Sequence, residues 1–284
     1  MQRVGPPERA NEKRGSSELA FSDDGVGYPL VFLHGLGGSR SQAQAAIVGV
    51  SGVRRIVIDA PAHGESARSA VPLSFGSFAD AMVDLLDELD VERAIFGGIS
   101  MGSGIALRIA LDFPQRVSGL VLVRPAWTDQ PGRPHLDIIA AMGAWIDRDG
   151  VSSARGILES DGRFQEIEAT VPLAAASIAR TIDGVEETGR PDVLGAMVDS
   201  HPIDDLADLA AVTQPALVVA TERDPLHPTE IADETAVALP NATSLLAPAR
   251  YIEPHAHQDF VTDAINSFIA SVVANEEEPT GDRP

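Results

Sequence analysis

The sequence contains no cysteine, and Lys13 is its only lysine. Without cysteine the chain forms no disulfide, holds no metal through thiolates and offers no cysteine nucleophile. Its 21 basic and 42 acidic residues give a formal net charge of −21. A charge of that sign and size repels nucleic-acid phosphates and anionic lipid. We therefore expect neither nucleic acid nor a membrane as a partner.

Long hydrophobic runs are also missing. No apolar stretch approaches the ~18–20 residues of a membrane-spanning helix, and residues 1–17 lack the apolar core of a secretory signal. These absences predict a soluble, cytoplasmic protein. Residues 1–16 are polar and rich in glycine and proline, and residues 274–284 are acidic and without pattern. We predict a flexible N-terminus and a disordered acidic tail there.

Between these ends, short apolar runs alternate with segments of helical period. The runs are continuously apolar, which is typical of parallel strands that are covered on both faces; they lie at 29–34, 54–59, 93–98, 119–124 and 216–221. Helical segments are predicted at 78–90, 100–112 and 257–273, where apolar residues recur on one face. This alternation predicts an α/β fold with a doubly wound, mostly parallel sheet.

One long segment, 125–214, interrupts the alternation. It holds no convincing buried strand but several helix-like pieces, such as LDIIAAMGAWIDR and PLAAASIARTI, cut by glycine and proline. A connection of that length is normally functional or a small domain of its own. We therefore predict an inserted helical lid at 125–214, and a core made of residues 17–124 and 215–273.

A glycine-rich turn, GGISMGSG at 97–104, follows the third predicted strand. Ligands of open parallel sheets bind beyond the carboxyl ends of the strands. Gly98 to Gly102 fit the pattern G-x-S-x-G, in which the central serine takes a strained backbone conformation that exposes its hydroxyl. Glycine is needed at both ends because a Cβ there would collide with neighbouring backbone. Ser100 is thus the predicted nucleophile, and the absence of a nearby lysine argues against a phosphate-binding loop.

With this turn in place, the chain resembles the α/β-hydrolases of the lidded, serine-nucleophile esterase and lyase type. The resemblance spans about 21–273 and rests on motifs in the family's order: VFLHGLGGS (31–39), IDAPAHGES (58–66), GGISMGSG, TERDPLHP (221–228) and a histidine near the last helix. It implies the α/β-hydrolase fold and a catalytic triad in the chain order Ser, acid, His.

The resemblance also implies which acid orients the base. A serine hydroxyl is a weak nucleophile that needs a base, and the base needs an orienting acid. The family's acid follows a strand, and Asp224 stands at such a place, with Glu222 as the second choice. Another site that some members use, after the strand at 119–124, carries Arg124 and cannot supply an acid.

The base is sought in YIEPHAHQDF (251–260), which contains His255 and His257. Family members commonly show Gly-His here, and this chain does not. We favour His257, because apolar residues at helical spacing follow it and place it at the helix entrance facing the sheet. His255 remains the alternative base. His227 sits beside the proposed acid and is a candidate to contact it.

By the same resemblance, the backbone N–H groups of Leu36 and Met101 form the oxyanion hole. The lid is expected to supply substrate contacts from Trp127, Met142 and Trp145, although each of these residues can equally pack the lid against the core. No cluster of side chains has metal-ligand spacing, so neither a metal nor a cofactor is predicted.

These residues together predict a serine hydrolase that cleaves a small or medium carboxylic ester or lactone through an acyl-enzyme. The same triad also serves C–C hydrolases, lyases and cofactor-free oxygenases or haloperoxidase-like enzymes, because a fold alone does not fix its chemistry. A non-catalytic ligand-binding member is a further alternative. The expected partner is a small-molecule substrate. The oligomeric state stays open, with a homodimer as one option.

Overall fold

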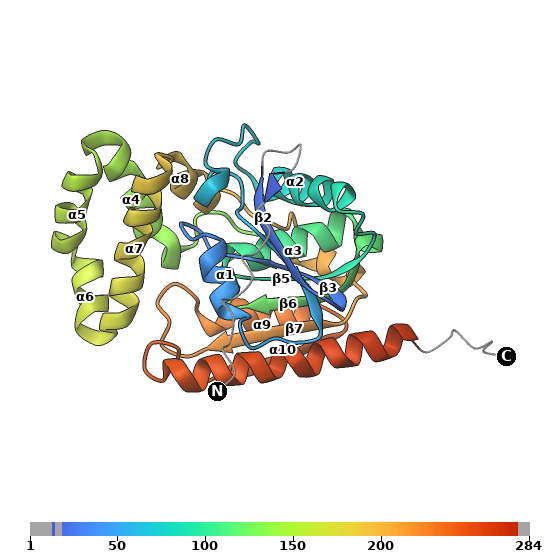
Figure 1. The fold of residues 1–284 in the computed structure, drawn as a ribbon. Helices are drawn as coiled ribbons and strands as arrows, with labels where there is room; N and C mark the ends of the chain where they lie inside the picture. Colours follow the sequence, from blue (N-terminus) through green and yellow to red (C-terminus); the bar gives the residue numbers. More distant parts are fainter. Residues whose placement is uncertain (1–12, 15–18, 278–284) are drawn as a thin grey trace, which may run out of the picture.

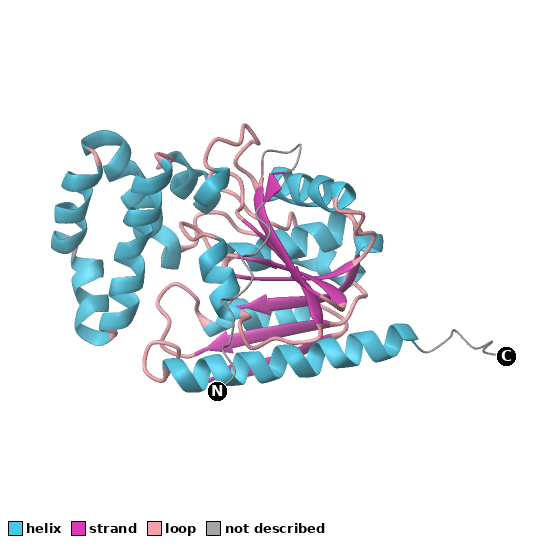
Figure 2. Cartoon of the chain, viewed as in Figure 1, coloured by secondary structure: helices cyan, strands magenta, loops and turns pink. Residues whose placement is uncertain are grey.

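The computed structural model describes residues 13–14 and 19–277, which form one eight-stranded sheet with helices on both faces (Figures 1 and 2). The strands are β1 (Lys13–Arg14), β2 (Ala20–Gly25), β3 (Tyr28–Leu33), β4 (Val53–Ile58), β5 (Ala94–Ile99), β6 (Val117–Val123), β7 (Ala216–Thr221) and β8 (Ala242–Ala247). The helices of the core are α1 (Arg40–Ala46), α2 (Phe75–Glu88), α3 (Met101–Asp112), α9 (Thr229–Ala238) and α10 (Pro254–Glu277), with short 3-10 turns at Gly64–Ser66 and Pro114–Arg116.

The strands lie in the order β1-β2-β4-β3-β5-β6-β7-β8. From β4 to β8 every neighbouring pair is parallel, whereas β1 and β2 join one edge in antiparallel fashion. The five strands predicted from apolar runs are β3 to β7, and the predicted fold class, a doubly wound and mostly parallel sheet, is confirmed. Strands β1, β2 and β8 were not predicted; β1 and β8 form the two edges of the sheet, and β2 lies next to β1.

Both faces of the sheet are buried, because alternate residues of each strand pack against different helices. Along β3, Val31 and Leu33 belong to one apolar core, and Leu30 and Phe32 to the other. The first core is covered by α2, α3 and α9, and the second by α1 and α10 (Figure 1). This burial explains why the central strands are mostly apolar. Arg54 and Arg55 of β4 are exceptions, and they pair with Asp23 and Asp24 of the neighbouring β2.

The chain between β6 and β7 contains helices and connecting loops but no strand, and it forms a lobe at one side of the sheet that we call the cap (Figure 2). Its elements are a 3-10 turn (Pro134–Leu136), α4 (Asp137–Asp149), α5 (Val151–Ser160), α6 (Gly162–Thr170), α7 (Pro172–Thr188), α8 (Asp192–Val198) and a second 3-10 segment (Leu206–Ala211). The last of these packs on α3 and α9 of the core. The insertion predicted at 125–214 therefore contains helices, and its final part returns to the core before β7 begins.

The two ends extend further into the fold than the sequence analysis predicts. Residues 13–14 pair with β2, and α10 continues to Glu277. The outer part of α10 is held because Glu276 contacts the Tyr28 hydroxyl and forms an ion pair with Arg93 at 2.7 Å. The rest of the segments predicted to be flexible lies outside the described residues. None of the helices described is long and apolar enough to cross a membrane.

Candidate active site

The sharp turn between β5 and α3 exposes a single serine at the carboxyl end of the sheet. Ser100 has φ 55° and ψ −113°, a conformation that strains any residue with a side chain. Its N–H donates to the carbonyl of Val123 at 3.0 Å, and its carbonyl accepts the N–H of Ser103 at 2.9 Å. The strained residue is therefore held by the neighbouring strand β6 on one side and by the first turn of α3 on the other.

Two glycines make this turn sterically feasible. A Cβ added to Gly98 would lie 2.7 Å from the Cα of Gly102, and a Cβ added to Gly102 would lie 2.5 Å from the carbonyl oxygen of Leu33. No side chain fits at either position without moving backbone atoms. Ser103 has a structural role, because its Oγ donates to the carbonyl of Gly98 at 2.8 Å.

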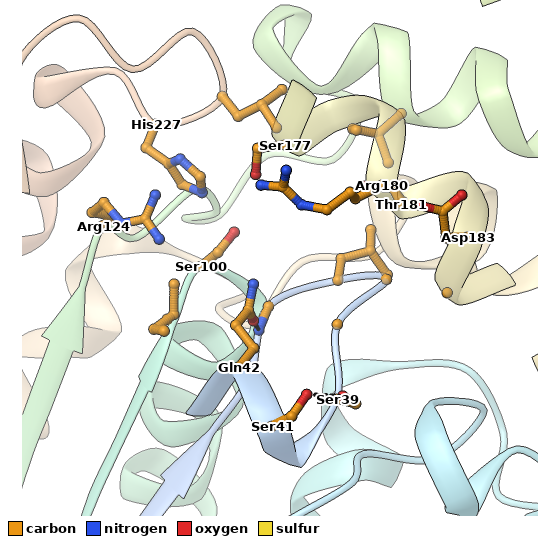
Figure 3. Close-up of a pocket in the computed structure, with 18 of the residues that line it drawn as sticks. Ser39, Ser41, Gln42, Ser100, Arg124, Ser177, Arg180, Thr181, Asp183 and His227 are labelled. Carbon is orange, nitrogen blue, oxygen red and sulfur yellow. Dashed lines mark hydrogen bonds between the residues drawn. The ribbon is translucent and has the colours of Figure 1, made fainter. Parts of the chain in front are cut away.

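Ser100 lies in a pocket of about 500 Å³ between the carboxyl ends of the strands and the cap helix α7 (Figure 3). This is where an open parallel sheet binds its ligands. The walls are more polar than the sequence analysis predicts. Polar and charged side chains come from the core and from α7, and the lining includes Ser39, Ser41, Gln42, Arg124, Ser177, Arg180, Thr181, Asp183, Glu187, His227, Arg250 and Tyr251.

The loop after β3 presents one unpaired backbone donor to this pocket. The N–H groups of Gly35, Gly37 and Gly38 donate to neighbouring acceptors at 2.7 to 3.1 Å. The N–H of Leu36 has no hydrogen-bond partner within the described part of the chain, and neither has that of Met101 at the start of α3. These are the two groups that the resemblance assigns to an oxyanion hole.

Two buried histidines fix the shape of that loop. His34 bonds the carbonyl of Gly35 through Nδ1 at 2.8 Å and accepts the N–H of Ala60 at Nε2, while Nε2 of His63 accepts the N–H of Gly37 at 3.1 Å. Burial lowers the pKa of His34 to about 4, and burial together with the nearby His34 lowers the pKa of His63 to about 3. Both rings are neutral at physiological pH and act as supports.

The cap touches the same loop directly. A Cβ added to Gly184 of α7 would lie 2.3 Å from the carbonyl oxygen of Gly37, and one added to Gly37, at φ 72°, would lie 2.5 Å from Thr181. The backbones of α7 and the loop are therefore in contact because neither glycine carries a side chain.

The loop after β7 brings an acid and a histidine together. The N–H of His227 donates to the carbonyl of Asp224 at 3.2 Å, and this turn places Nδ1 of His227 2.8 Å from Oδ1 of Asp224. The ring N–H is not aligned on that oxygen, so the contact is mainly electrostatic in this structure. The other carboxylate oxygen, Oδ2, accepts a hydrogen bond from Nη1 of Arg124 at 2.9 Å. Glu222, the second choice for the acid, is exposed and outside this pocket.

Nearby charges and burial shift the pKa values of Asp224 and His227 in opposite directions. Burial raises the pKa of the Asp224 carboxyl, but His227 and the permanent charge of Arg124 outweigh it, so the net shift is downward. Burial lowers the pKa of His227 below its ordinary value, against the attraction of Asp224. At neutral pH the carboxylate is ionised and the imidazole is neutral, as a triad requires.

His227 and Ser100 both face the pocket (Figure 3). No hydrogen bond joins them in this structure, and the Ser100 hydroxyl has no hydrogen-bond partner among the residues described. Catalytic hydrogen bonds are often long or poorly aligned until substrate is bound.

The two histidines favoured from the sequence lie elsewhere. Helix α10 begins at Pro254, so His255 and His257 belong to its first turns and not to a loop over the strand ends. His255 is exposed, and Nδ1 of His257 bonds the carbonyl of Pro248 at 2.9 Å. His257 lines a neighbouring cavity of about 330 Å³ but not the Ser100 pocket. The structure thus brings His227, and neither predicted base, into the pocket with Ser100.

Of the three predicted lid contacts, one reaches the pocket. Trp127 lines it and is oriented by a hydrogen bond from Nε1 to the carbonyl of Met197 at 3.1 Å. Met142 is fully buried in the apolar core and Trp145 packs against that core, and neither lines the pocket. These two residues stabilise the cap by packing.

Comparisons with known proteins agree with this architecture. Residues 28–149 match the sequence model of the alpha/beta hydrolase fold family. A thermophilic esterase from Thermogutta terrifontis, solved with malate bound, superposes with a TM-score of 0.71 over 93% of this chain and 99% of that one, at 23% identity. These comparisons show that the chain has the α/β-hydrolase fold.

Curated relatives match over shorter stretches. The sn-1-specific diacylglycerol lipase ABHD11 of Danio rerio is 37% identical over 149 residues, which cover 50% of this chain and 47% of the lipase. A protein of Mycobacterium phage D29, named provisionally as a non-heme haloperoxidase, is 38% identical over 123 residues, or 43% of each chain. The matches thus span less than half the length of these relatives.

Proposed function

We propose that this protein is a serine hydrolase that cleaves carboxylic esters or lactones through an acyl-enzyme, with Ser100, His227 and Asp224 as its triad. The observation that carries the proposal is a single pocket. It holds a serine in a strained elbow, a neutral histidine in contact with a buried carboxylate, and a glycine-rich loop with a free N–H. The similarity to an esterase fold and to a lipase sequence supports ester bonds as the target.

In the proposed reaction, Oγ of Ser100 attacks the carbonyl carbon while His227 accepts the hydroxyl proton at Nε2. The tetrahedral oxyanion is stabilised by the N–H groups of Leu36 and Met101. His227 then gives its proton to the leaving alcohol, and the acyl group remains on Ser100. A water molecule then attacks the acyl-enzyme, again with His227 as the base, and the carboxylic acid leaves Ser100. Throughout, Asp224 stabilises the imidazolium that forms.

The base in this proposal differs from the one expected from the sequence. His227 is three residues beyond Asp224 in a turn, so the acid and the base come from one loop. The chain order Ser, acid, His is retained. The loop after β8 presents Arg250 to the pocket instead of a histidine.

The proposal is tested by labelling with a fluorophosphonate and mapping the modified peptide, because the reagent requires a nucleophile that is activated by a base. We expect label on Ser100, none on the Ser100→Ala variant, and label retained by Ser103→Ala, whose hydroxyl donates to the carbonyls of Gly98 and Val123 and does not face the pocket. Ligand binding without any label on Ser100 would favour a non-catalytic binding protein and overturn the proposal.

The pH profile follows from the environment of His227. Burial lowers its pKa below the ordinary value of 6.5, and only the neutral ring accepts a proton from Ser100. We therefore expect kcat/KM to hold a plateau at neutral pH and to fall on acidification, with a midpoint below pH 6.5. Initial rates on an activated ester between about pH 4 and pH 8 measure this, since kcat/KM reports ionisations of the free enzyme. A midpoint above that value would exclude His227 in this environment as the base.

A further inference from the structure

Three arginines line the Ser100 pocket, and two of them have no acidic partner. Arg124 is paired with Asp224. Arg180 of the cap helix α7 and Arg250 of the loop before α10 form no ion pair with any carboxylate in the part of the chain that the structure describes. Arg250 only stacks over the ring of Tyr251, with its guanidinium carbon 5.6 Å from the ring centre.

The two free arginines approach the pocket from different elements. Figure 3 shows the guanidinium of Arg180 reaching over the pocket toward Ser177, on the same side as Ser100 and His227. Both Arg180 and Arg250 also line the adjoining cavity that contains His257, so they stand where the two cavities meet. The charge of Arg124, and then burial, lower the pKa of Arg250 to about 10. It therefore keeps its proton at neutral pH.

The charges around this pocket do not cancel. Asp183 lies on the wall but is paired with Arg155 at 2.6 Å, and Asp224 is paired with Arg124. Glu187, on the exposed side of α7, is the remaining acidic group of the lining. Two free cations against one carboxylate leave a single positive charge in a chain whose formal net charge is −21. Arg250 is half-buried, and an unpaired cation in such a place is costly unless an anion reaches it. Arg180 is exposed and can reach the same anion from the cap.

We infer that the substrate of this hydrolase carries a carboxylate group, which Arg180 and Arg250 bind while Ser100 attacks the ester or lactone carbonyl. The inference rests on the proposed function of Ser100. A guanidinium presents parallel N–H donors that match the two oxygens of a carboxylate. The single excess positive charge matches a monoanion better than a dianionic phosphate. The apolar part of such a substrate fits against Trp127, Leu136 and Ile139.

The test compares matched substrates with and without a carboxylate. On the acyl side, 4-nitrophenyl hemiglutarate is compared with 4-nitrophenyl pentanoate, and on the alcohol side 3-acetoxybenzoate with phenyl acetate. We expect kcat/KM to favour the carboxylate in at least one pair. Arg180→Gln and Arg250→Gln should each lower that preference by about 10- to 100-fold, the size expected for a lost charge-assisted hydrogen bond.

Arg148→Gln is the matched control. Arg148 also lies on the cap, but it is exposed and pairs with Asp149, and it does not line the pocket. We expect this variant to keep the wild-type preference. The inference fails, while the proposed function stands, if three results are found together. These are hydrolysis of the neutral esters, no preference for the carboxylate in either pair, and arginine variants that behave like Arg148→Gln.

Binding is measured separately from turnover with the Ser100→Ala variant. Calorimetry should show that glutaramate, the monoanionic monoamide of glutarate, binds and that the neutral diamide glutaramide does not. Arg180→Gln and Arg250→Gln should weaken glutaramate binding by about 10-fold or more. If Ser100 is not labelled by fluorophosphonate but glutaramate binds through both arginines, the hydrolase proposal fails and the carboxylate site stands. Tighter binding of inorganic phosphate than of glutaramate would overturn the assignment of a carboxylate.

Discussion

Replacing His227 with alanine is expected to lower kcat for hydrolysis of an activated ester by about 10⁴-fold or more, because loss of the triad base removes most of the catalysis beyond binding. His257→Ala provides the matched comparison. Both histidines are largely buried, and His257 Nδ1 bonds the carbonyl of Pro248 in the neighbouring cavity. We expect His257→Ala to retain kcat within about 10-fold, with any loss arising from altered packing.

Steady-state kinetics on each purified variant give kcat. The melting temperature of the same variant shows whether a loss of activity comes from unfolding. The assignment of His227 is wrong if His257→Ala loses more activity than His227→Ala while both remain folded. That result would mean that the loop before α10 rearranges when substrate binds, so that His257 reaches Ser100.

Asp224→Asn is expected to lower kcat by about 10³- to 10⁴-fold, since the amide no longer stabilises the protonated His227. It should also destabilise the fold by about 3–5 kcal/mol, the usual cost of leaving one member of a buried ion pair without its partner. The side chains of Arg124 and Asp224 are only 3% and 0% exposed. Denaturant titration and steady-state kinetics measure the two effects on the same preparation.

The double variant Arg124→Met with Asp224→Asn separates these two consequences. Removing both charges relieves the unpaired guanidinium, and uncharged replacements of buried ion pairs are often tolerated. We expect the stability to recover by about half or more of the loss, while kcat stays at the level of Asp224→Asn. If activity returns with stability, Asp224 supports the fold and does not orient the base.

The central part of the fold follows from the sequence because its strands are buried on both faces. Strands β3 to β7 are mostly apolar, with Arg54 and Arg55 of β4 as exceptions, and short runs of this kind are typical of strands that are buried on both faces. Half of the residues of β8 are exposed, and β2 contains Ser22, Asp23 and Asp24. Strands at or next to the edge of a sheet carry polar residues that weaken the apolar signal, so neither strand is evident from the sequence.

The nucleophile and the base differ in how far sequence patterns constrain them. The pattern around Ser100 fixes a local geometry, because Gly98 and Gly102 touch backbone that any side chain would displace. The base depends on where a loop ends and a helix begins, and the sequence did not show that α10 starts at Pro254. A usable signal was present in the spacing of Asp224 and His227, since a turn brings side chains three residues apart together.

The arginines of the pocket were missed for a related reason. Arg124, Arg180 and Arg250 come from a strand end, a cap helix and a distant loop, and their convergence is a property of the fold alone. In a chain with so strong an acidic excess, three scattered basic residues give no compositional signal.

The contact between Gly37 and Gly184 restricts which cap sequences are compatible with this core as the protein evolves. Because α7 rests directly on the carbonyl of Gly37, a cap grafted from another protein needs a residue without a side chain at position 184. Any larger residue displaces that carbonyl and disturbs the loop that carries the Leu36 amide. Divergence in substrate range is therefore directed to Ser177 and Arg180, which lie two turns and one turn earlier on the same helix.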